Sequence, residues 1–304
     1  MNKDTEPVLD LEVNPQNQYF CSPLTKCKGF TKLMMIVTMI KQHPELIDEI
    51  KNHEKDVDRQ NELGWTALMI LCRNLDTWGS QDALDEILKL KPNLNLQNTK
   101  GITALKIACS YINQGTTVLT IKKLLENGAD PNIEDNDGNL PLHVCFYNTD
   151  EESNKQIVEL LVTHNSKINY IKNISGLTPL MVACSQLDVV QIDTIKFMIS
   201  KGANILIKNE FGDSLMTLLR YFLGQILIFD NSNQSSPPKL NKKIDQKKLK
   251  NNVEKIIELI PILKGNYVNG SFMTACAYFD MYQAFLESDD LYYKYFMQIY
   301  DLIE

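Results

Sequence analysis

The chain has 304 residues, of which 44% are hydrophobic and 23% charged, a composition typical of soluble globular proteins and not of disordered ones. Its formal net charge of -7 argues against a nucleic-acid partner, because phosphate contacts require clustered basic side chains. The longest apolar stretches are too short or too interrupted to span a bilayer, and the N-terminus lacks a signal-peptide pattern. We therefore expect an intracellular protein, cytoplasmic or nuclear, that has no membrane partner and keeps its cysteines reduced.

The first segment, residues 1–28, is polar and contains prolines at positions 7, 15 and 23. Such a segment has little apolar surface to bury on folding. We expect it to form a loosely ordered N-terminal arm.

One sequence motif recurs along the chain from residue 29 onward. Its clearest copies are GWTALMILC, GITALKIAC and GLTPLMVAC, which begin at Gly64, Gly101 and Gly176. The glycines that open successive copies are 35 to 38 residues apart, at positions 29, 64, 101, 138, 176 and 212, and a weaker copy begins at position 270. A recurring motif at this period indicates a repeat architecture.

Each unit predicts two helices joined by a loop. In the first helix, a threonine caps the N-terminus, a leucine supplies a buried contact and an alanine allows close helix approach. The capping threonines are Thr31, Thr66, Thr103 and Thr178. The leucines are Leu68, Leu105, Leu142 and Leu180, and the alanines are Ala108 and Ala183. The second helix, clearest at residues 121–127 and 195–201, has apolar residues at spacings of three and four, which indicates one buried face. Gly128 and Gly202 end these helices, and the Asn, Asp and Gly residues that follow predict a tight turn.

These residues resemble the ankyrin repeat, in which Gly-x-Thr-Pro-Leu-His-x-Ala precedes a second helix ending in Gly-Ala-Asp and a turn. The resemblance covers residues 29 to 213 and continues more loosely toward the C-terminus. It implies an all-α ankyrin-repeat solenoid of about six to seven stacked helix-turn-helix units with short β-turn or hairpin connections. The units exceed the usual ~33 residues, and the surplus falls between the two helices, at 74–81, 112–117 and 148–154. Such loops look like those of ankyrin proteins of large DNA viruses such as mimiviruses, which implies a viral protein in the host cell cytoplasm.

The positions of the cysteines and histidines indicate structural roles in packing, not roles in catalysis or metal binding. Cys72, Cys109, Cys184 and Cys276 share one repeat position and Cys145 precedes it, so stacking spreads their sulfurs along a row instead of converging them on a metal. No histidine pairs with a nucleophile and an orienting acid, and no phosphate-binding glycine loop occurs. The acidic turn at 133–138 lacks the length and terminal glutamate of a calcium loop. We therefore expect no enzyme activity, no metal and no cofactor.

The repeat array, residues 29–229, is followed by two segments that depart from the pattern. Residues 230–250 are polar and then lysine-rich, which predicts a mobile insertion, with a nuclear-import or anion-binding patch as the alternative. Residues 251–304 predict a degenerate terminal repeat and an aromatic-rich C-terminal cap. The alternative for this last segment is a ligase-recruiting element, as in the F-box-like ends of poxvirus ankyrin proteins, although a Leu-Pro-x-Glu opening is missing.

The resemblance implies a monomeric, non-catalytic module that binds a partner protein on the concave ankyrin face. In similar proteins, partner contacts come from turn tips, from the residue after the repeat glycine and from the exposed edge of the first helix. On this chain that surface comprises Leu63, Trp65, Arg73, Lys100, Ile102, Tyr111, Asp137, Asn139, Tyr147, Ile174, Leu177, Glu210 and Phe211. We expect Trp65 to project from its turn as an anchor; packing on the adjacent repeat is the alternative for the apolar members. The alternative function is a substrate adaptor that recruits a ubiquitin ligase through the C-terminal segment.

Overall fold

The structure is a computed structural model that describes residues 29–215 except 76–78, 113–115, 148–150 and 188–189, together with residues 218, 227–228, 239–240, 255 and 258–259. The helices in this part are α1 (Lys32–Met39), η2 (Pro44–Asp56), α2 (Ala67–Arg73), α3 (Gln81–Lys89), α4 (Ala104–Ser110), α5 (Val118–Glu126), α6 (Pro141–Val144), α7 (Glu151–Thr163), α8 (Pro179–Ser185) and α9 (Ile192–Ser200). All are α-helices apart from η2, a 3₁₀ helix with a kink at His53.

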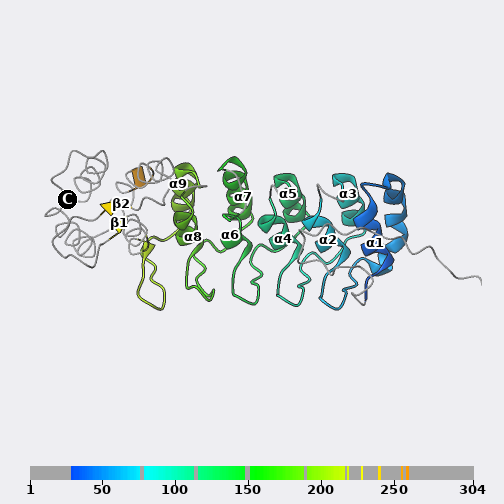
Figure 1. Ribbon diagram of the computed structural model, residues 1–304, viewed down its shortest axis with the longest axis horizontal. Coiled ribbons are helices and arrows are strands. Elements are labelled where there is room, and N and C mark those ends of the chain that lie inside the picture. Colours follow the sequence, from blue (N-terminus) through cyan, green and yellow to red (C-terminus); the bar gives the residue numbers. More distant parts are fainter. Residues whose placement is uncertain are drawn as a thin grey trace, which may run out of the picture.

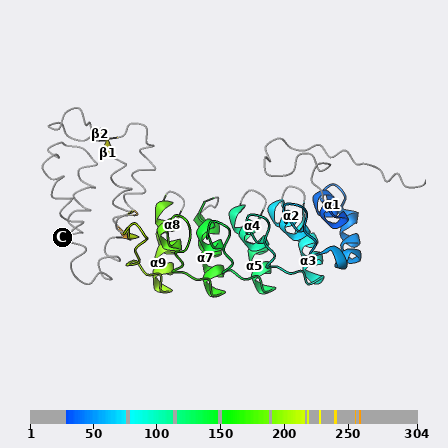
Figure 2. The same ribbon diagram turned by 90° about the horizontal axis from the view of Figure 1, so that it is seen from below.

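The helices form two layers that run the length of the array. The first helices of the units, α1, α2, α4, α6 and α8, lie side by side in one layer, and η2, α3, α5, α7 and α9 lie in the other (Figures 1 and 2). This arrangement confirms the predicted all-α solenoid of stacked helix pairs. Five pairs fall within the described residues, and the further one or two units that the sequence predicts lie outside them.

The helix ends follow from the repeated residues. Each predicted threonine cap accepts a hydrogen bond from the backbone N–H three residues on, at 3.2 Å in Thr31, Thr66, Thr103 and Thr178. Gly128 and Gly202 end their helices with φ angles of 95° and 93°, in the left-handed region that favours glycine. The motif therefore sets where each helix begins and where the second helix ends.

The core is one continuous apolar cluster between the two layers. The motif leucines, Leu68, Leu105, Leu142 and Leu180, are at most 2% exposed. Cys72, Cys109, Cys145 and Cys184 are buried free thiols, as their repeat positions predict. Burial raises the pKa of Cys72 and of Cys184 to about 12, so both sulfurs stay protonated. Cys276 lies outside the described residues.

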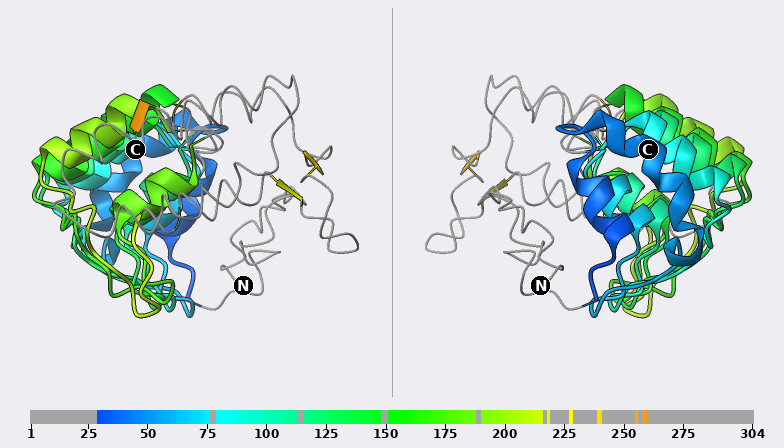
Figure 3. Two further views of the ribbon diagram at one scale, coloured as in Figure 1. Left: turned by 90° about the vertical axis from the view of Figure 1, so that its left-hand side faces the viewer. Right: turned by 90° about the vertical axis from the view of Figure 1, so that its right-hand side faces the viewer.

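Five long hairpins lead from one unit to the next and project from the same side of the helix layers (Figure 3). We name them hairpin 1 (58–65), hairpin 2 (93–102), hairpin 3 (130–139), hairpin 4 (167–177) and hairpin 5 (204–213). The hairpins stack closely: at Gly101, where φ is 73°, an added Cβ would lie only 2.8 Å from the backbone nitrogen of Asn136. Only glycine fits both this conformation and this approach.

Few residues beyond hairpin 5 are described. Lys255 donates hydrogen bonds to the carbonyls of Leu187 and Val190, and Leu259 is fully buried, so this stretch packs on the α8–α9 pair. Two short strands, β1 (Leu227–Ile228) and β2 (Lys239–Leu240), pair antiparallel. The predicted arm (1–28) and the rest of the predicted insertion (230–250) and C-terminal segment (251–304) lie outside the described residues. None of the described helices is long and apolar enough to cross a membrane.

Candidate functional site

In hairpins 1 to 5, an Asn or Asp three residues before the repeat glycine fixes the shape of the tip; the four asparagines are buried and the aspartate is half-buried. In hairpin 2, Asn98 Oδ1 accepts hydrogen bonds from the N–H groups of Lys100, at 2.9 Å, and Ile102, at 3.0 Å. The equivalent residues are Asn61, Asp135, Asn173 and Asn209. The residues just before the glycine therefore sit on a fixed turn that directs their side chains outward. The sequence does contain a signal for this role, namely an Asn or Asp at a constant distance before the glycine, but the motif described above does not include that position.

Polar side chains also cross-link hairpins 1, 2 and 3. Gln97 Nε2 donates to the carbonyl of Gly101 in its own hairpin, at 2.7 Å, and to that of Glu134 in the next, at 2.8 Å. Gln60 makes the same pair of bonds one unit earlier. Backbone bonds join the tips of hairpins 1 to 4, from Thr99 to Leu63, from Asn136 to Lys100 and from Ile174 to Asp137. These hairpins act as one continuous ribbon.

Hairpins 4 and 5 keep only the kind of bond at the base that Asn95 and Asn132 also make between the earlier hairpins. Their bonds lie at the base, where Asn169 Oδ1 accepts from Asn204 N–H at 2.7 Å and Asn169 Nδ2 donates to Gly202 at 2.8 Å. Within the described residues no backbone hydrogen bond joins the two tips. The tips instead present Ile174, which is 77% exposed, and Phe211, which is 79% exposed.

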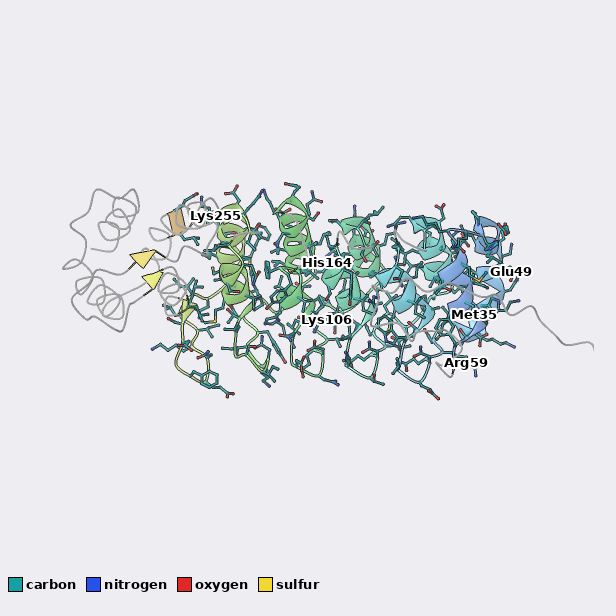
Figure 4. All side chains as sticks on the ribbon, viewed as in Figure 1. Met35, Glu49, Arg59, Lys106, His164 and Lys255 are labelled. Carbon is teal, nitrogen blue, oxygen red and sulfur yellow. The ribbon has the colours of Figure 1, made fainter. Side chains whose placement is uncertain are left out.

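Hairpin 3 contains a buried ion pair. Lys106, in the first turn of α4, pairs its ammonium with the Asp135 carboxylate and donates to the carbonyl of Asn139 at 2.7 Å. Lys106 is buried, and Figure 4 shows it on the hairpin side of the first-helix layer. Desolvation lowers the pKa of Lys106, against the opposing effect of Asp135. Met69, His143 and Met181 occupy the matching position in other units, and only Lys106 faces an aspartate in place of the usual asparagine.

Residues 114–209 match the sequence family described as ankyrin repeats (3 copies). The chain contains ankyrin repeats. An ankyrin repeat protein of Acanthamoeba polyphaga mimivirus is 30% identical over 194 residues, which cover 63% of this chain and 22% of that protein. One from Rickettsia felis is 48% identical over 59 residues, which cover 19% of this chain and 25% of that protein. The chain thus spans only part of the length of its curated relatives, and its predicted resemblance to ankyrin proteins of large DNA viruses is confirmed.

A solved structure shares the ankyrin-type fold. In the complex of a predatory endopeptidase from Bdellovibrio bacteriovorus with an immunity protein, one chain superposes with a TM-score of 0.50 at 22% identity. The match covers 64% of this chain and 94% of that chain. At this identity the likeness supports the fold alone. Ankyrin repeats in general act as non-catalytic protein-interaction modules, and the matched family is the reason to look for a partner surface here.

The residues predicted at the ankyrin hairpin tips are all on the surface. Leu63 is 40% exposed, and the strongly exposed Ile174 and Phe211 lie at the other end of the row. The charged tip residues Lys100, Asp137 and Glu210 are exposed as well. The hairpin row therefore brings six of the predicted residues onto one edge of the molecule.

The residues that follow the repeat glycines are placed differently. Trp65, Ile102 and Leu177 are half-buried and pack against the apolar core. The expectation that Trp65 projects from its turn is wrong, because its ring covers the core at the helix side of the hairpin. Asn139 is half-buried, and its backbone N–H donates to Asp135. These four residues are therefore less exposed than the residues at the tips.

The three predicted residues at the edge of the first helices split into two kinds. Arg73 is only 5% exposed, and its guanidinium lies 4.9 Å from the ring centroid of Tyr111, a cation–π contact within the array. Arg73 is thus not the exposed anchor that the sequence suggested. Tyr111 is half-buried, whereas Tyr147 is 54% exposed. Only Tyr147 presents a large part of its ring to the surface.

Histidine, cysteine and acidic side chains are the groups of the described part to consider as metal ligands. No group of three or more His, Cys, Asp and Glu residues there is placed to hold a metal ion. His143 is buried, and its Nδ1 accepts from Leu140 N–H at 3.1 Å, the capping role that Met34 and Met181 sulfurs play elsewhere. Burial lowers the pKa of His143 to about 4, so the ring is neutral near pH 7.

Proposed function

We propose that this chain is a non-catalytic interaction module that binds one partner protein along the row of ankyrin hairpin tips, mainly through hairpins 4 and 5. The observation that carries the proposal is the exposure of Ile174 and Phe211, at 77% and 79%, on adjacent hairpins. Large apolar side chains that gather on an exposed edge are typical of interaction sites. Covering them with a partner would remove their apolar surface from water.

The rigidity of the tips supports this role. Phe211 N–H donates to Asn209 Oδ1 at 3.0 Å, and Ile174 N–H donates to the carbonyl of Asp137 at 2.9 Å. Both backbones are therefore fixed before a partner arrives. A preorganised surface loses little conformational entropy on binding, which favours affinity.

The remaining predicted contacts have smaller roles. Exposed charges on the rim of an interface, here Lys100, Asp137 and Glu210, act chiefly on the association rate and on partner choice. Leu63 and Tyr147, which are also exposed, extend the same surface toward hairpin 1 and the first helices. We propose that the chain acts in this way as a monomer inside the cell.

The adaptor alternative depends on residues 265–304, which lie outside the described part of the chain. No described residue favours ligase recruitment over simple partner binding. The proposed function therefore ends with binding.

An affinity capture experiment tests the proposal. The full chain and its Ile174→Ser/Phe211→Ser variant are used as baits in the same cell extract, and the captured proteins are quantified by mass spectrometry. We expect a specific partner on the wild-type bait that falls at least tenfold on the variant. Leu119→Ser is the matched control, because Leu119 is 47% exposed on α5, away from the hairpins. A partner retained by the double variant, or lost equally from the control, would contradict the proposal.

A further inference from the structure

Helix α6 begins differently from the other first helices in the described part of the chain. Those helices start at a threonine whose hydroxyl accepts a backbone N–H, whereas α6 starts after Leu140, which has no side-chain acceptor. The side-chain bond at the start of α6 comes instead from His143, whose Nδ1 accepts the Leu140 N–H at 3.1 Å. At four residues, α6 is also the shortest of the described helices. Its start therefore depends on one imidazole nitrogen.

The two hydrogen-bond partners of His143 determine its protonation state. The Leu140 N–H can only donate, so Nδ1 carries no proton. The Leu177 carbonyl, 3.2 Å from Nε2, can only accept, so Nε2 carries the proton. Leu177 belongs to hairpin 4, so the same ring joins α6 to the next unit. A second proton would have to bind Nδ1, where it would face the Leu140 N–H, and the ring must leave this position to accept it.

The first helices on both sides of α6, which Figure 1 shows as its neighbours α4 and α8, do not favour a cation at His143. On α4, the Lys106 ammonium repels an imidazolium. Asp135 of hairpin 3 attracts one, but its carboxylate is already paired with Lys106. Helix α8 contributes no charged side chain, since its sequence is PLMVACS. Burial is the main reason why the pKa of His143 is low.

Hairpin 4 and α7 complete the surroundings of the ring. Tyr170 places its ring centroid 6.2 Å from that of His143, and its hydroxyl donates to the Glu134 carboxylate. The Lys167 ammonium lies 5.7 Å from the centroid of the Tyr170 ring. On α7, the charged residues whose side chains are described are exposed or half-buried, namely Glu152, Lys155 and Glu159. These groups surround the contact between α6 and hairpin 4 without supplying a second hydrogen-bond acceptor for His143.

We infer that His143 is a proton-sensitive switch: when it binds a second proton, its ring leaves Leu140 and Leu177, and α6 opens while the threonine-capped helices stay folded. The other first helices do not respond in the same way, because a threonine hydroxyl does not titrate in this pH range. The closed form is complete above about pH 6.5, where histidine is neutral, and the open form increases as the pH falls below that value.

The cysteine row allows the opening to be measured unit by unit. The Cys145 thiol is buried at the C-terminal end of α6, where Sγ contacts the Leu142 carbonyl at 3.5 Å. The buried Cys72 thiol on the threonine-capped α2 is the internal reference. The native full chain is labelled with a pyridyl disulfide at pH 7 and at pH 5, and peptide mass spectrometry gives the rate at each cysteine. We expect the ratio of the Cys145 rate to the Cys72 rate to rise at least ~tenfold at pH 5.

Three variants identify the group that is responsible. His143→Met should abolish the rise, since Met181 fills the matching position in α8. Leu140→Thr, which installs the cap of the other units and keeps His143, should reduce it. His164→Gln is the matched control, because His164 is a half-buried histidine directly after α7 that contacts the Leu160 carbonyl at 2.8 Å, and this variant should keep the rise.

The remaining outcomes would overturn the inference. If Cys145 and Cys72 accelerate together, the chain unfolds as a whole and α6 does not open by itself. An unchanged ratio at pH 5, a rise that persists in His143→Met, or a rise lost in His164→Gln would exclude His143 as the switch. Labelling requires no partner protein, so these results leave the proposed function to its own test.

Discussion

Hairpins 2 and 3 use their polar side chains to bind one another, whereas hairpins 4 and 5 leave apolar side chains uncovered at their tips. Gln97 joins hairpins 2 and 3 through two carbonyls, and a backbone bond joins their tips. Between hairpins 4 and 5, the described bonds lie at the base, through Asn169, and the tips carry Ile174 and Phe211. The array therefore separates the side chains that hold the stack together from the side chains available to a partner.

The buried pair in hairpin 3 should give the largest loss of stability. Asp135→Asn leaves the Lys106 ammonium buried without its carboxylate, which should lower the free energy of unfolding by about 3–5 kcal/mol. Chemical denaturation of the full chain measures this change. The double variant Lys106→Met/Asp135→Asn, which installs the pair found in other units, should recover most of the loss. If the single variant is as stable as the wild type, hairpin 3 does not depend on this pair.

The next largest effect is a pH dependence in the same region. The pKa of His143 falls from its usual 6.5 to about 4 in the folded chain, so the unfolded chain binds the proton more readily between these values. Stability that is fully present above about pH 6.5 should therefore be lost as the pH falls toward 4. The loss should amount to about 3 kcal/mol, at ~1.36 kcal/mol per pKa unit.

His143→Met isolates that contribution, because Met181 fills the matching position in α8. Besides desolvation by burial, the groups that influence His143 are Lys106, Asp135, the carbonyl of Leu177 and the backbone of Leu140. Unfolding free energies of both proteins at several pH values between 7 and 4 give the comparison. Parallel pH profiles for the variant and the wild type would rule out His143 as the source.

A smaller effect should come from the cross-links between hairpins. Gln97→Ala removes two hydrogen bonds and should lower the unfolding free energy by ~1 kcal/mol, since the side chain is exposed and each bond contributes little net. The matched control is Lys208→Ala, an exposed side chain on hairpin 5 that should leave stability unchanged. Equal denaturation midpoints for both variants would mean that the link between hairpins 2 and 3 does not need these bonds.

The smallest stability effect should occur at the apolar tips. Phe211 is 79% exposed, so Phe211→Ala should change the unfolding free energy by less than ~0.5 kcal/mol. Thermal unfolding of the full chain measures the change. A drop comparable to that of a buried motif leucine, ~2–5 kcal/mol for Leu105→Ala, would show that the Phe211 ring is part of the core.

The sequence predicted the helices and their caps, but only part of the candidate surface. The repeat period specifies which residues are buried, because stacking is the only way for a unit to cover its apolar face. Exposure of the residues near each hairpin depends instead on side-chain direction, which the period does not encode. Trp65 packs inward although it follows the glycine, and Arg73 is buried on Tyr111. The Lys106–Asp135 pair, which joins two units, was not recognised from a motif read one unit at a time.

The central claim is that hairpins 4 and 5 hold the partner while hairpins 1 to 3 hold the stack. The most direct test titrates the captured partner against two folded variants, Ile174→Ser/Phe211→Ser and Gln97→Ala/Thr99→Ala, and measures the stability of each. The account predicts that the tip variant loses at least ~2 kcal/mol of binding free energy with little change in stability. The cross-link variant should lose stability and keep its affinity. Equal losses of affinity in the two variants, or a loss confined to the cross-link variant, would contradict the claim.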